Sequence, residues 1–241
     1  MKTSRLFQKN RVSGGLIDRS KPLGFSFDGQ DYTGFSGDTL ASALLANDVR
    51  LVGRSFKYHR PRGILTAGSE EPNALLKIGK GASEDANCRA TTVELFDRLT
   101  AKSQTKLGHL SFDLMAVNDL LSSLLGAGFY YKTFMWPAAF WEKLYEPLIR
   151  KAAGLGCLSG EADPDCYDKG YLHCDLLIIG SGPSGLMAAL TAAESGLQVI
   201  LADEDFCLGG RLNAETQEID GMKSTTFAAK TLGVLGAMDN V

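Results

Sequence analysis

The sequence predicts a protein of the mixed α/β class, in which an α+β part is followed by the beginning of an α/β part. Two observations support this prediction. Residues 174–210 contain two apolar runs joined by a glycine-rich turn and a small-residue helical stretch, and the second run ends in acids. This is the pattern of a Rossmann-type dinucleotide-binding domain. Residues 23–52 contain a hairpin pattern, a short helical pattern and a further apolar pair, which is how a small β-grasp domain begins.

Composition limits the classes of function. The chain has 241 residues, 44% of them apolar, so it can bury cores for two small domains. A net charge of −3 gives no field that would recruit nucleic acid. The apolar runs are too short to span a membrane and the amino terminus lacks a signal-peptide core, so a cytoplasmic chain is expected. Five scattered cysteines without a CxxC pair indicate reduced thiols, and three histidines without ligand spacing indicate no metal site.

The glycine-rich turn follows the apolar run Leu176–Ile179, which has the length and branching of a strand buried on both faces. Gly180 allows a tight turn out of that strand, and Gly182 lets the backbone come close to a pyrophosphate. Gly185 lets the following helix lie close to the strand. The helix begins near Pro183, and its unpaired N–H groups and its dipole are expected to face the phosphates.

Acidic side chains follow the second apolar run, Val199–Leu201, about 20 residues after the turn. Either Asp203 or Glu204 would accept hydrogen bonds from the adenosine ribose, with Glu204 preferred, and an acid here favours NAD or FAD over NADP. Gly209 and Gly210 follow at the spacing of a second close approach to the dinucleotide. The alternative is a glycine-rich turn that binds nothing. The candidate cofactor-binding residues are Gly180, Ser181, Gly182, Pro183, Ser184, Gly185, Asp203, Glu204, Gly209, Gly210 and Arg211.

The amino-terminal part is predicted from turn and cap signals. Leu23–Phe35 alternates apolar and polar residues around Asp28-Gly29, a dipeptide that favours tight hairpin turns. Leu40–Ala46 is expected to be a short helix after a polar cap, and Leu51-Val52 a further strand. The polar and basic residues 1–22 are expected to form a tail or an arm that lies on another surface.

The densest basic segment is Arg54–Gly63, in which basic side chains alternate with aromatic ones. The negative net charge disfavours nucleic-acid binding. Pairing with carboxylates of a neighbouring domain or subunit, or with a cofactor phosphate, is the preferred interpretation, and a solvated basic loop is the alternative. Glu70 and Glu71 at the next turn are expected to be solvated charges without chemistry. Ala74–Ile78 is an expected strand, and after a polar loop Thr91–Leu99 is expected to be another strand or a short element.

Helical patterns fill the middle and the end of the chain. Asp113–Leu125 carries apolar residues at helical spacing, and Glu146–Ala153 is a second expected helix. Between them, Phe129–Tyr145 is so rich in aromatic residues that a large permanent interface is favoured over a satellite core. Gly156–Gly170 is the expected linker, and Lys223–Met238 the last expected helix.

These elements divide the chain into three expected segments. They are a β-grasp domain at 1–100, a helical, aromatic-rich connecting or interface segment at 101–170, and an incomplete dinucleotide-binding domain at 171–241. A doubly wound sheet needs at least a third strand, which the sequence has not supplied by Val241. The chain is therefore expected to be the front of a longer protein.

Several stretches together carry a specific resemblance. They are DGQDYTGFSGDTLASALLANDV, RSFKYHRPRGILTAGSEEPNALLKIG, NCRATTVELFD, FDLMAVNDLLSSLL, AGFYYKTFMWPAAFWEKLYEPLIRKAAGLG and the dinucleotide block. In this order they resemble the amino-terminal part of the alpha subunit of heterotetrameric sarcosine oxidases, over essentially the whole chain.

The resemblance implies a ferredoxin-like β-grasp domain followed by a domain that holds NAD. It implies beta, gamma and delta subunits as partners, with FAD and covalent FMN on the beta subunit. The complex would oxidise sarcosine to glycine with O2, giving H2O2, and pass the one-carbon unit to tetrahydrofolate. No catalytic residue falls within this chain on that basis, so it is expected to be inactive alone.

The resemblance also bears on iron. Related amine and opine dehydrogenase subunits carry a four-cysteine 2Fe-2S loop after a similar basic segment. Here residues 66–76 contain no cysteine and the nearest is Cys88, whereas a cluster needs four thiolates. The ferredoxin-like domain is therefore expected to hold no Fe–S cluster. The alternatives to an oxidase are a subunit of a related NAD- or flavin-dependent amine or opine dehydrogenase, and a non-catalytic docking fragment.

Overall fold

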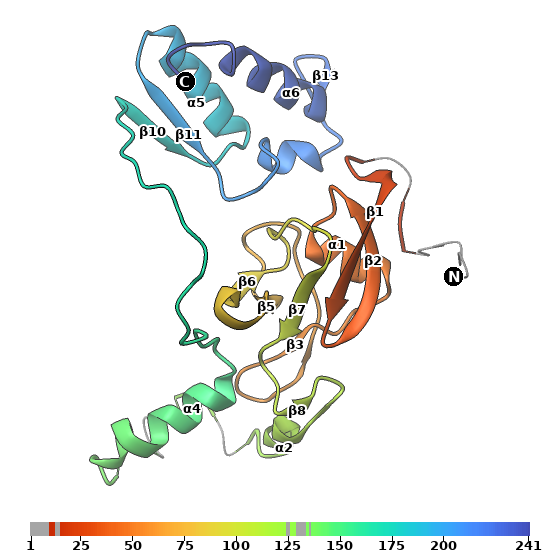
Figure 1. Cartoon of the computed structure of the whole chain (residues 1–241), viewed down its shortest axis with the longest axis vertical. Helices are drawn as coiled ribbons and strands as arrows, with labels where there is room; N and C mark the ends of the chain where they lie inside the picture. The colour runs from red at the N-terminus through yellow and green to blue at the C-terminus, as the bar shows by residue number, and fades with distance from the viewer. Residues whose placement is uncertain (1–9, 13–14, 124–125, 129–133, 135) are drawn as a thin grey trace. The chain divides into compact units, whose positions relative to one another are not determined.

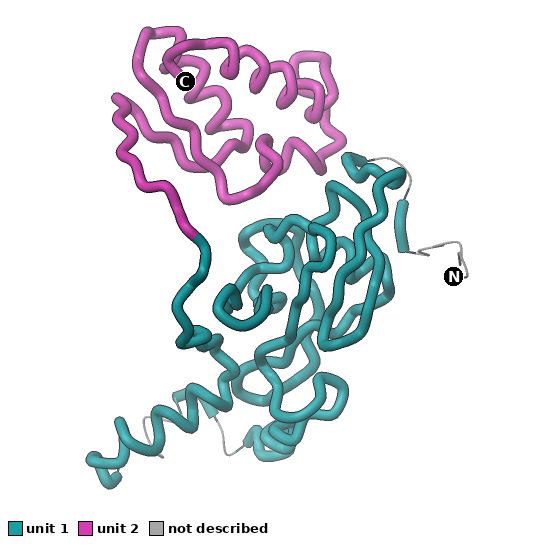
Figure 2. The backbone as a smooth tube through the Cα atoms, in the orientation of Figure 1, with its two compact units in different colours: residues 1–165 teal, residues 166–241 magenta. Residues whose placement is uncertain are grey.

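A computed structural model describes residues 10–12, 15–123, 126–128, 134 and 136–241. The chain forms two compact units, Met1–Asp165 and Cys166–Val241 (Figure 1, Figure 2). Each unit has its own cluster of buried apolar side chains. The expected division into three segments, with boundaries at 100 and 170, is finer than this and stays a prediction.

Within its described residues, the first unit is built on a five-stranded mixed sheet in the order β2-β1-β7-β5-β6. Its strands are β1 (Asp18–Phe27), β2 (Gln30–Ser36), β5 (Leu75–Ile78), β6 (Asp85–Arg89) and β7 (Leu99–Ser103). β1 and β7 run parallel, and the other neighbouring pairs are antiparallel. The parallel pair needs a long connection, and the rest of the domain provides it.

The β1–β2 hairpin closes with a two-residue turn at Asp28 and Gly29. Both residues have positive φ, 49° and 84°, as a type I′ turn requires. Asp28 also accepts hydrogen bonds from the N–H and the hydroxyl of Ser103, at 2.9 and 2.6 Å, which joins the turn to β7. The predicted hairpin is confirmed.

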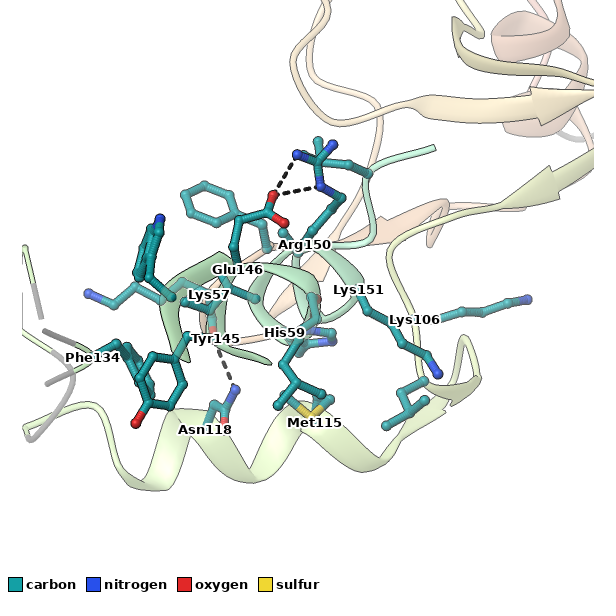
Figure 3. A pocket seen from close by; sticks show the side chains of 18 residues that line it. Lys57, His59, Lys106, Met115, Asn118, Phe134, Tyr145, Glu146, Arg150 and Lys151 are labelled. Carbon is teal, nitrogen blue, oxygen red and sulfur yellow. Dashed lines mark hydrogen bonds and ion pairs between the residues drawn. The ribbon is translucent and has the colours of Figure 1, made fainter. Parts of the chain in front are cut away.

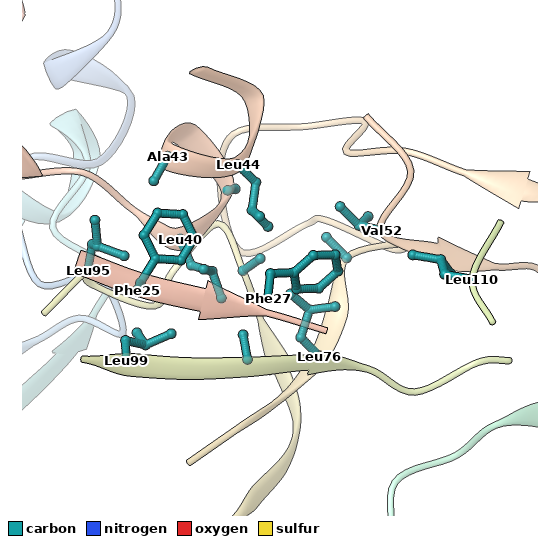
Figure 4. Close-up of a cluster of buried hydrophobic side chains, with 14 residues drawn as sticks. Phe25, Phe27, Leu40, Ala43, Leu44, Val52, Leu76, Leu95, Leu99 and Leu110 are labelled. Atoms are coloured by element: carbon teal, nitrogen blue, oxygen red, sulfur yellow. The ribbon is translucent and has the colours of Figure 1, made fainter. Parts of the chain in front are cut away.

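α1 (Leu40–Ala46) packs against the sheet, and the side chains between them form the first core (Figure 4). Thr39 caps the helix, because its hydroxyl accepts from the N–H of Ser42 while the Ser42 hydroxyl accepts from the N–H of Thr39. The predicted helix is confirmed. The larger core side chains include Phe25, Phe27, Leu40, Leu44, Leu76 and Leu99.

The strand expected at Leu51-Val52 is wrong, because the short ladder begins one residue further along the chain. β3 (Gly53–Arg54) pairs with β4 (Pro61–Arg62), and Val52 is instead a fully buried core residue. The strand expected at Ala74–Ile78 is confirmed as β5. The polar residues after it are not all loop, since they contain a 3-10 turn, η1 (Gly81–Ser83), and the start of β6.

Thr91–Leu99, expected to be a strand or a short element, does not form a strand before Leu99. Directly after β6 the chain turns, because the N–H groups of Thr92 and Val93 both bond to the carbonyl of Arg89. The residues that follow are irregular until β7 begins at Leu99. The apolar side chains that suggested a strand here serve the core instead, and Leu95 is buried in it.

The segment after the sheet is helical only in short pieces. It contains β8 (Gly108–His109), β9 (Phe112–Asp113), η2 (Leu114–Ala116), α2 (Val117–Leu120), a π turn η3 (Trp141–Tyr145) and α4 (Glu146–Ala153). The helix expected over Asp113–Leu125 is wrong in length, because η2 and α2 bury no residue and a short helix depends on packing. The helix expected at Glu146–Ala153 is confirmed. Residues 129–133 and 135 of the aromatic segment, and 124–125 before it, lie outside the described residues.

Arg11 fixes the described part of the amino-terminal arm to the first unit. Its guanidinium bonds to both carboxylate oxygens of Asp38, with Nη1 at 2.9 Å from Oδ1, and lies 5.1 Å from the ring centre of Phe35. Asp38 is fully buried and also accepts from the N–H of Phe35 and the hydroxyl of Ser42. This part of the arm therefore lies on the hairpin and on α1.

The basic segment Arg54–Gly63 makes its described contacts within its own unit. Arg54 donates to two carbonyls of the turn between β8 and β9, at 2.8–3.2 Å. Arg60 pairs with Asp119 at 2.6 Å, and His59 is buried. The carboxylate pairing that the sequence suggested is thus present, but inside the first unit.

The second unit contains two adjacent parallel strands with helices packed on them. Its elements are β10 (Leu176–Ile179), α5 (Pro183–Glu194), β11 (Val199–Ala202), η4 (Gly210–Asn213), β12 (Glu218–Ile219), β13 (Met222–Lys223) and α6 (Ser224–Leu235). β10 and β11 pair in parallel from Leu176↔Val199 to Ile179↔Ala202, as the sequence predicts. The expectation that Leu176–Ile179 is buried on both faces is wrong, because Leu176, Leu177 and Ile179 are exposed and, among the described residues, β10 has a single neighbouring strand. The last expected helix is confirmed as α6. None of the helices in the described ranges has the length and apolar content to cross a membrane.

Candidate dinucleotide-binding site

The candidate site lies at the carboxyl ends of β10 and β11, where the chain leaves the sheet through the glycine turn. The N–H of Gly180 bonds to the carbonyl of Ala202 at 2.7 Å, which extends the parallel ladder by one step. Gly180 then turns with a φ of 100°, a conformation that favours glycine, and Gly182 is the cap of α5. Open α/β sheets bind their ligands at this edge.

Two glycines of the turn have opposite surroundings. A Cβ placed on Gly182 meets no atom within 4 Å, so the backbone borders open space that a ligand can enter. A Cβ on Gly185 would lie 1.9 Å from the carbonyl oxygen of Gly180, so this glycine is needed for α5 to lie against β10. These surroundings suit the two roles that the sequence suggests, close approach of a ligand and close packing of the helix.

The amino end of α5 is open. Pro183 is its first residue, where the missing N–H costs little, and no side chain caps the helix. Pro183 and Ser184 are both exposed. The free N–H groups of the first turn and the positive end of the helix dipole therefore lie beside the open space at Gly182, an arrangement that favours an anionic phosphate.

Ser181 holds the turn together, a role that the sequence reasoning missed. It is fully buried, and both its N–H and its hydroxyl donate to Oδ2 of Asp203 at 2.5 Å. Its hydroxyl oxygen accepts from the N–H of Gly209 at 2.8 Å. One side chain thus joins the glycine turn, the end of β11 and the loop after it. The sequence feature that could have predicted this role is a hydroxyl side chain in the glycine turn together with an acidic residue after the second strand.

The two candidate acids after β11 have different surroundings. Asp203 is partly buried, and its Oδ1 accepts from the N–H of Asp205 at 3.0 Å while Oδ2 serves the glycine turn. Burial alone would raise the pKa of Asp203, but these hydrogen bonds lower it and keep the carboxylate charged. Glu204 is exposed. Asp203 therefore shapes the turn as an anion, and the preference for Glu204 as the ribose acceptor stays a prediction.

The loop after β11 passes directly beside the glycine turn. Gly209 and Gly210 have positive φ values of 121° and 51°. A Cβ on Gly210 would lie 3.1 Å from the Cα of Gly182, which shows how closely the two backbones approach. Arg211 is exposed and pairs with Glu215 at 2.9 Å. The structure thus brings the candidate residues of the turn, the acids and this loop into one region.

This arrangement can bind a ligand, and it contains no recognisable reaction centre. An open backbone surface, an uncapped helix end and nearby acids fit the diphosphate and ribose of a dinucleotide. Over the described part of the chain, no three His, Cys, Asp or Glu side chains gather so that they could hold a metal ion. We therefore treat the candidate residues as binding residues and assign no catalytic group among them.

Comparison with known proteins gives two family matches. Residues 20–106 match the family described as 2Fe-2S iron-sulfur cluster binding domain. Residues 175–235 match the family described as FAD dependent oxidoreductase. The coarse prediction of a ferredoxin-like part followed by a nucleotide-binding oxidoreductase part is confirmed at this level.

Relatives with known names match nearly the whole chain. It is 60% identical to the sarcosine oxidase subunit alpha of Rhizobium meliloti, over 94% of this chain and 23% of that protein. It is 36% identical to the sarcosine oxidase subunit alpha of Corynebacterium sp. (strain U-96), over 90% of this chain and 18% of that protein. The chain thus spans less than a quarter of the length of these relatives, and the predicted resemblance to sarcosine oxidase alpha subunits is confirmed. Among solved structures, the chain is similar to L-proline dehydrogenase from P. horikoshii over 90% of this chain and 32% of that one, at 20% identity and a TM-score of 0.48.

The expectation that the ferredoxin-like domain holds no Fe–S cluster is contradicted by the first family match, because that family is described by 2Fe-2S binding. The expectation relied on the missing cysteines of residues 66–76. Within residues 20–106 this chain has one cysteine, Cys88, which is partly buried and whose pKa is raised by burial and by Asp85. Cys88 alone is one of the four thiolates that a 2Fe-2S site uses.

Proposed function

We propose that this chain is the scaffold and NAD-binding portion of a sarcosine oxidase alpha subunit. In this proposal, residues 1–100 form a ferredoxin-like scaffold, 101–170 connect and contact partners, and 171–241 begin the dinucleotide-binding domain. The similarity to sarcosine oxidase alpha subunits along nearly the whole chain supports the family.

The observation that carries nucleotide binding is the bare backbone at Gly182, which borders open space beside the uncapped end of α5. N–H groups of the turn and the helix would hold the diphosphate. Glu204 or Asp203 would accept from the ribose, and an acid there favours the free 2′-hydroxyl of NAD over NADP. FAD is the alternative that the second family match raises. NAD supplies hydride-transfer chemistry when bound, and the residues of this chain bind and orient it.

We propose that the catalytic activity requires other subunits besides this chain. The alpha subunit would work with beta, gamma and delta subunits, and the complex would oxidise sarcosine to glycine with O2. The products would be H2O2 and a one-carbon unit passed to tetrahydrofolate. Because the candidate site contains only binding groups, the chain is expected to be inactive alone.

Calorimetric titration of the full chain with NAD, and then with FAD, tests the nucleotide site. Saturable binding is expected for the unmodified chain and for Gly233→Val, whose Cβ also meets no atom within 4 Å but lies in α6. Gly182→Val should lose the binding. A chain that binds neither nucleotide, or a Gly182→Val variant that binds as well as the unmodified chain, would contradict the proposal.

A further inference from the structure

The first unit contains a cavity of about 1030 Å³ that the nucleotide site does not involve (Figure 3). Three segments of the first unit supply most of its lining, and Lys106, Leu107 and Phe134 also line it. The three segments are the loop between β3 and β4, the residues around η2 and α2, and η3 together with α4. Its size is at the upper end of the range for ligand pockets.

His59 joins these three segments to one another. It is 1% exposed, with Nδ1 at 2.7 Å from Oδ2 of Asp113 and Nε2 at 2.8 Å from the carbonyl oxygen of Ala152. Asp113 also accepts from the N–H of Met115 at 2.8 Å, at the start of η2. These bonds hold the carboxyl end of α4 against the rest of the unit on this side of the cavity.

The helix that borders the cavity has an apolar stripe that no described residue buries. Trp141, Leu144 and Leu148 follow one another at helical spacing and are 37%, 44% and 57% exposed, and neither η3 nor α4 buries any residue. A surface helix normally buries such a stripe against its own domain. Leu144 does not line the cavity, so the stripe extends beyond it. A small molecule in the cavity would leave part of the stripe in water, whereas a polypeptide can cover both.

The cavity lining has the composition of a protein interface. Its larger apolar side chains include Phe56, Met115, Phe134, Trp141 and Tyr145. Aromatic residues and methionine are concentrated in protein–protein contacts, where they provide most of the binding energy. A contiguous exposed apolar surface rimmed by polar residues is a common feature of interaction sites. These residues therefore favour a polypeptide occupant.

Charged side chains around the cavity have a positive excess. They are Lys57, Lys106, Arg150 and Lys151, against the single carboxylate of Glu146. Glu146 is bonded to Arg150 at 2.7 Å, and Lys106 pairs with Asp28 at 2.8 Å. Lys151 is exposed and, among the described residues, makes no hydrogen bond or ion pair with its side chain. An occupant with carboxylates beside its apolar residues would complement this rim.

We propose that the cavity and the α4 stripe bind an acidic, apolar polypeptide segment of a partner subunit. Aromatic or branched apolar side chains of that segment enter the cavity, and its Asp or Glu residues face Lys151. This inference rests on the proposed function, because it takes the partner to be another subunit of the same oxidase.

The proposal is tested by using interferometry to measure the affinity of the full chain for separately purified beta, gamma and delta subunits. Leu148→Asp should weaken binding of one subunit at least tenfold, as expected for an interface anchor. Lys151→Glu should weaken the same complex and reduce its dependence on salt. Leu65→Asp and Lys80→Glu are the matched controls, because both residues are exposed and neither lines the cavity. The controls should bind within twofold of the unmodified chain.

The outcomes separate this inference from the proposed function. Leu148 and Lys151 are both exposed, so their variants should keep the circular dichroism spectrum and melting temperature of the unmodified chain. If those variants bind a subunit as tightly as the unmodified chain, the docking surface is wrong and the oxidase proposal remains. If the unmodified chain binds no subunit, both are wrong, while NAD titration still reports on the nucleotide site. Self-association that Leu148→Asp abolishes would show that a second copy covers the surface and would overturn the proposed partner.

Discussion

Replacing two glycines of the same turn should separate folding from ligand binding. Gly185→Ala adds a Cβ that would lie 1.9 Å from the carbonyl oxygen of Gly180. A carbon and a carbonyl oxygen normally come no closer than about 3.3 Å, and the oxygen belongs to the backbone, so α5 or the turn must move by roughly 1 Å or more. Such overpacking costs about 1–3 kcal/mol of stability.

Gly182→Val should leave the fold nearly unchanged. Gly182 has a φ of −64° and a ψ of −179°, which any residue can adopt, and its Cβ would meet no atom within 4 Å. The loss of a glycine cap should cost less than about 1 kcal/mol. The valine side chain would fill the space proposed for the diphosphate, so the affinity for NAD should fall at least tenfold, or about 1.4 kcal/mol.

Urea denaturation followed by circular dichroism measures the first effect, and calorimetric titration with NAD measures the second. The expected pattern is a destabilised Gly185→Ala and a stable Gly182→Val that no longer binds. If Gly182→Val unfolds as readily as Gly185→Ala, the space over Gly182 is not open. If it is stable and binds NAD normally, the diphosphate does not lie at this turn.

Three other changes test the remaining parts of the structure. Arg11→Met should lower the free energy of unfolding by roughly 3–5 kcal/mol, because it leaves the buried carboxylate of Asp38 without its cation. Thermal denaturation measures this loss, and an unchanged melting temperature would contradict it. Burial alone would raise the pKa of Glu71, but hydrogen bonds from backbone N–H groups outweigh burial and lower it. The ionised carboxylate therefore contributes its full stabilisation of the fold above the unfolded-state pKa of about 4.3. This contribution is lost as the pH falls through the lower pKa of the folded state. Glu71→Gln should therefore flatten this acid-side loss in urea titrations between pH 2 and 6, and an unchanged slope would contradict the assignment. Asp203→Asn should lower both stability and NAD affinity because its carboxylate holds the glycine turn, whereas Glu204→Gln should lower NAD affinity alone, as denaturation and calorimetry can show.

The parts of the fold that the sequence predicted are those with local causes. Asp28-Gly29 favours the positive φ values that close the β1–β2 hairpin, so turn and flanking strands could be placed together. Thr39 precedes an apolar helical pattern and forms the cap of α1. The runs Leu176–Ile179 and Val199–Leu201, separated by a glycine turn and a helix, can hardly pair other than in parallel. Each of these signals lies within a few residues of the feature that it predicts.

What the sequence could not predict depends on contacts between distant residues. Glu71 looked like a solvated charge beside Glu70, yet it is 2% exposed and its carboxylate accepts from four backbone N–H groups, those of residues 65, 66, 73 and 74. No local pattern shows that a loop will curl around a carboxylate. β7 was missed for the same reason, because its strand forms only when Leu99 pairs with Phe25. The structural role of Ser181 was missed because its partner Asp203 is 22 residues away.

Both candidate sites consist of surface groups whose hydrogen-bonding or apolar contacts are not provided by the described part of the fold. Throughout the described residues, every buried side-chain nitrogen or oxygen has a hydrogen-bond partner, so the interior has no polar group left to satisfy. The amino end of α5 keeps N–H groups without a side-chain cap beside a bare glycine, and an anion placed there gains both hydrogen bonds and a favourable interaction with the helix dipole. The stripe on α4 keeps exposed apolar area, which gains free energy only when another apolar surface covers it. The two proposals therefore assign a different class of partner to each unit, a phosphate-bearing small molecule to the second and a polypeptide to the first.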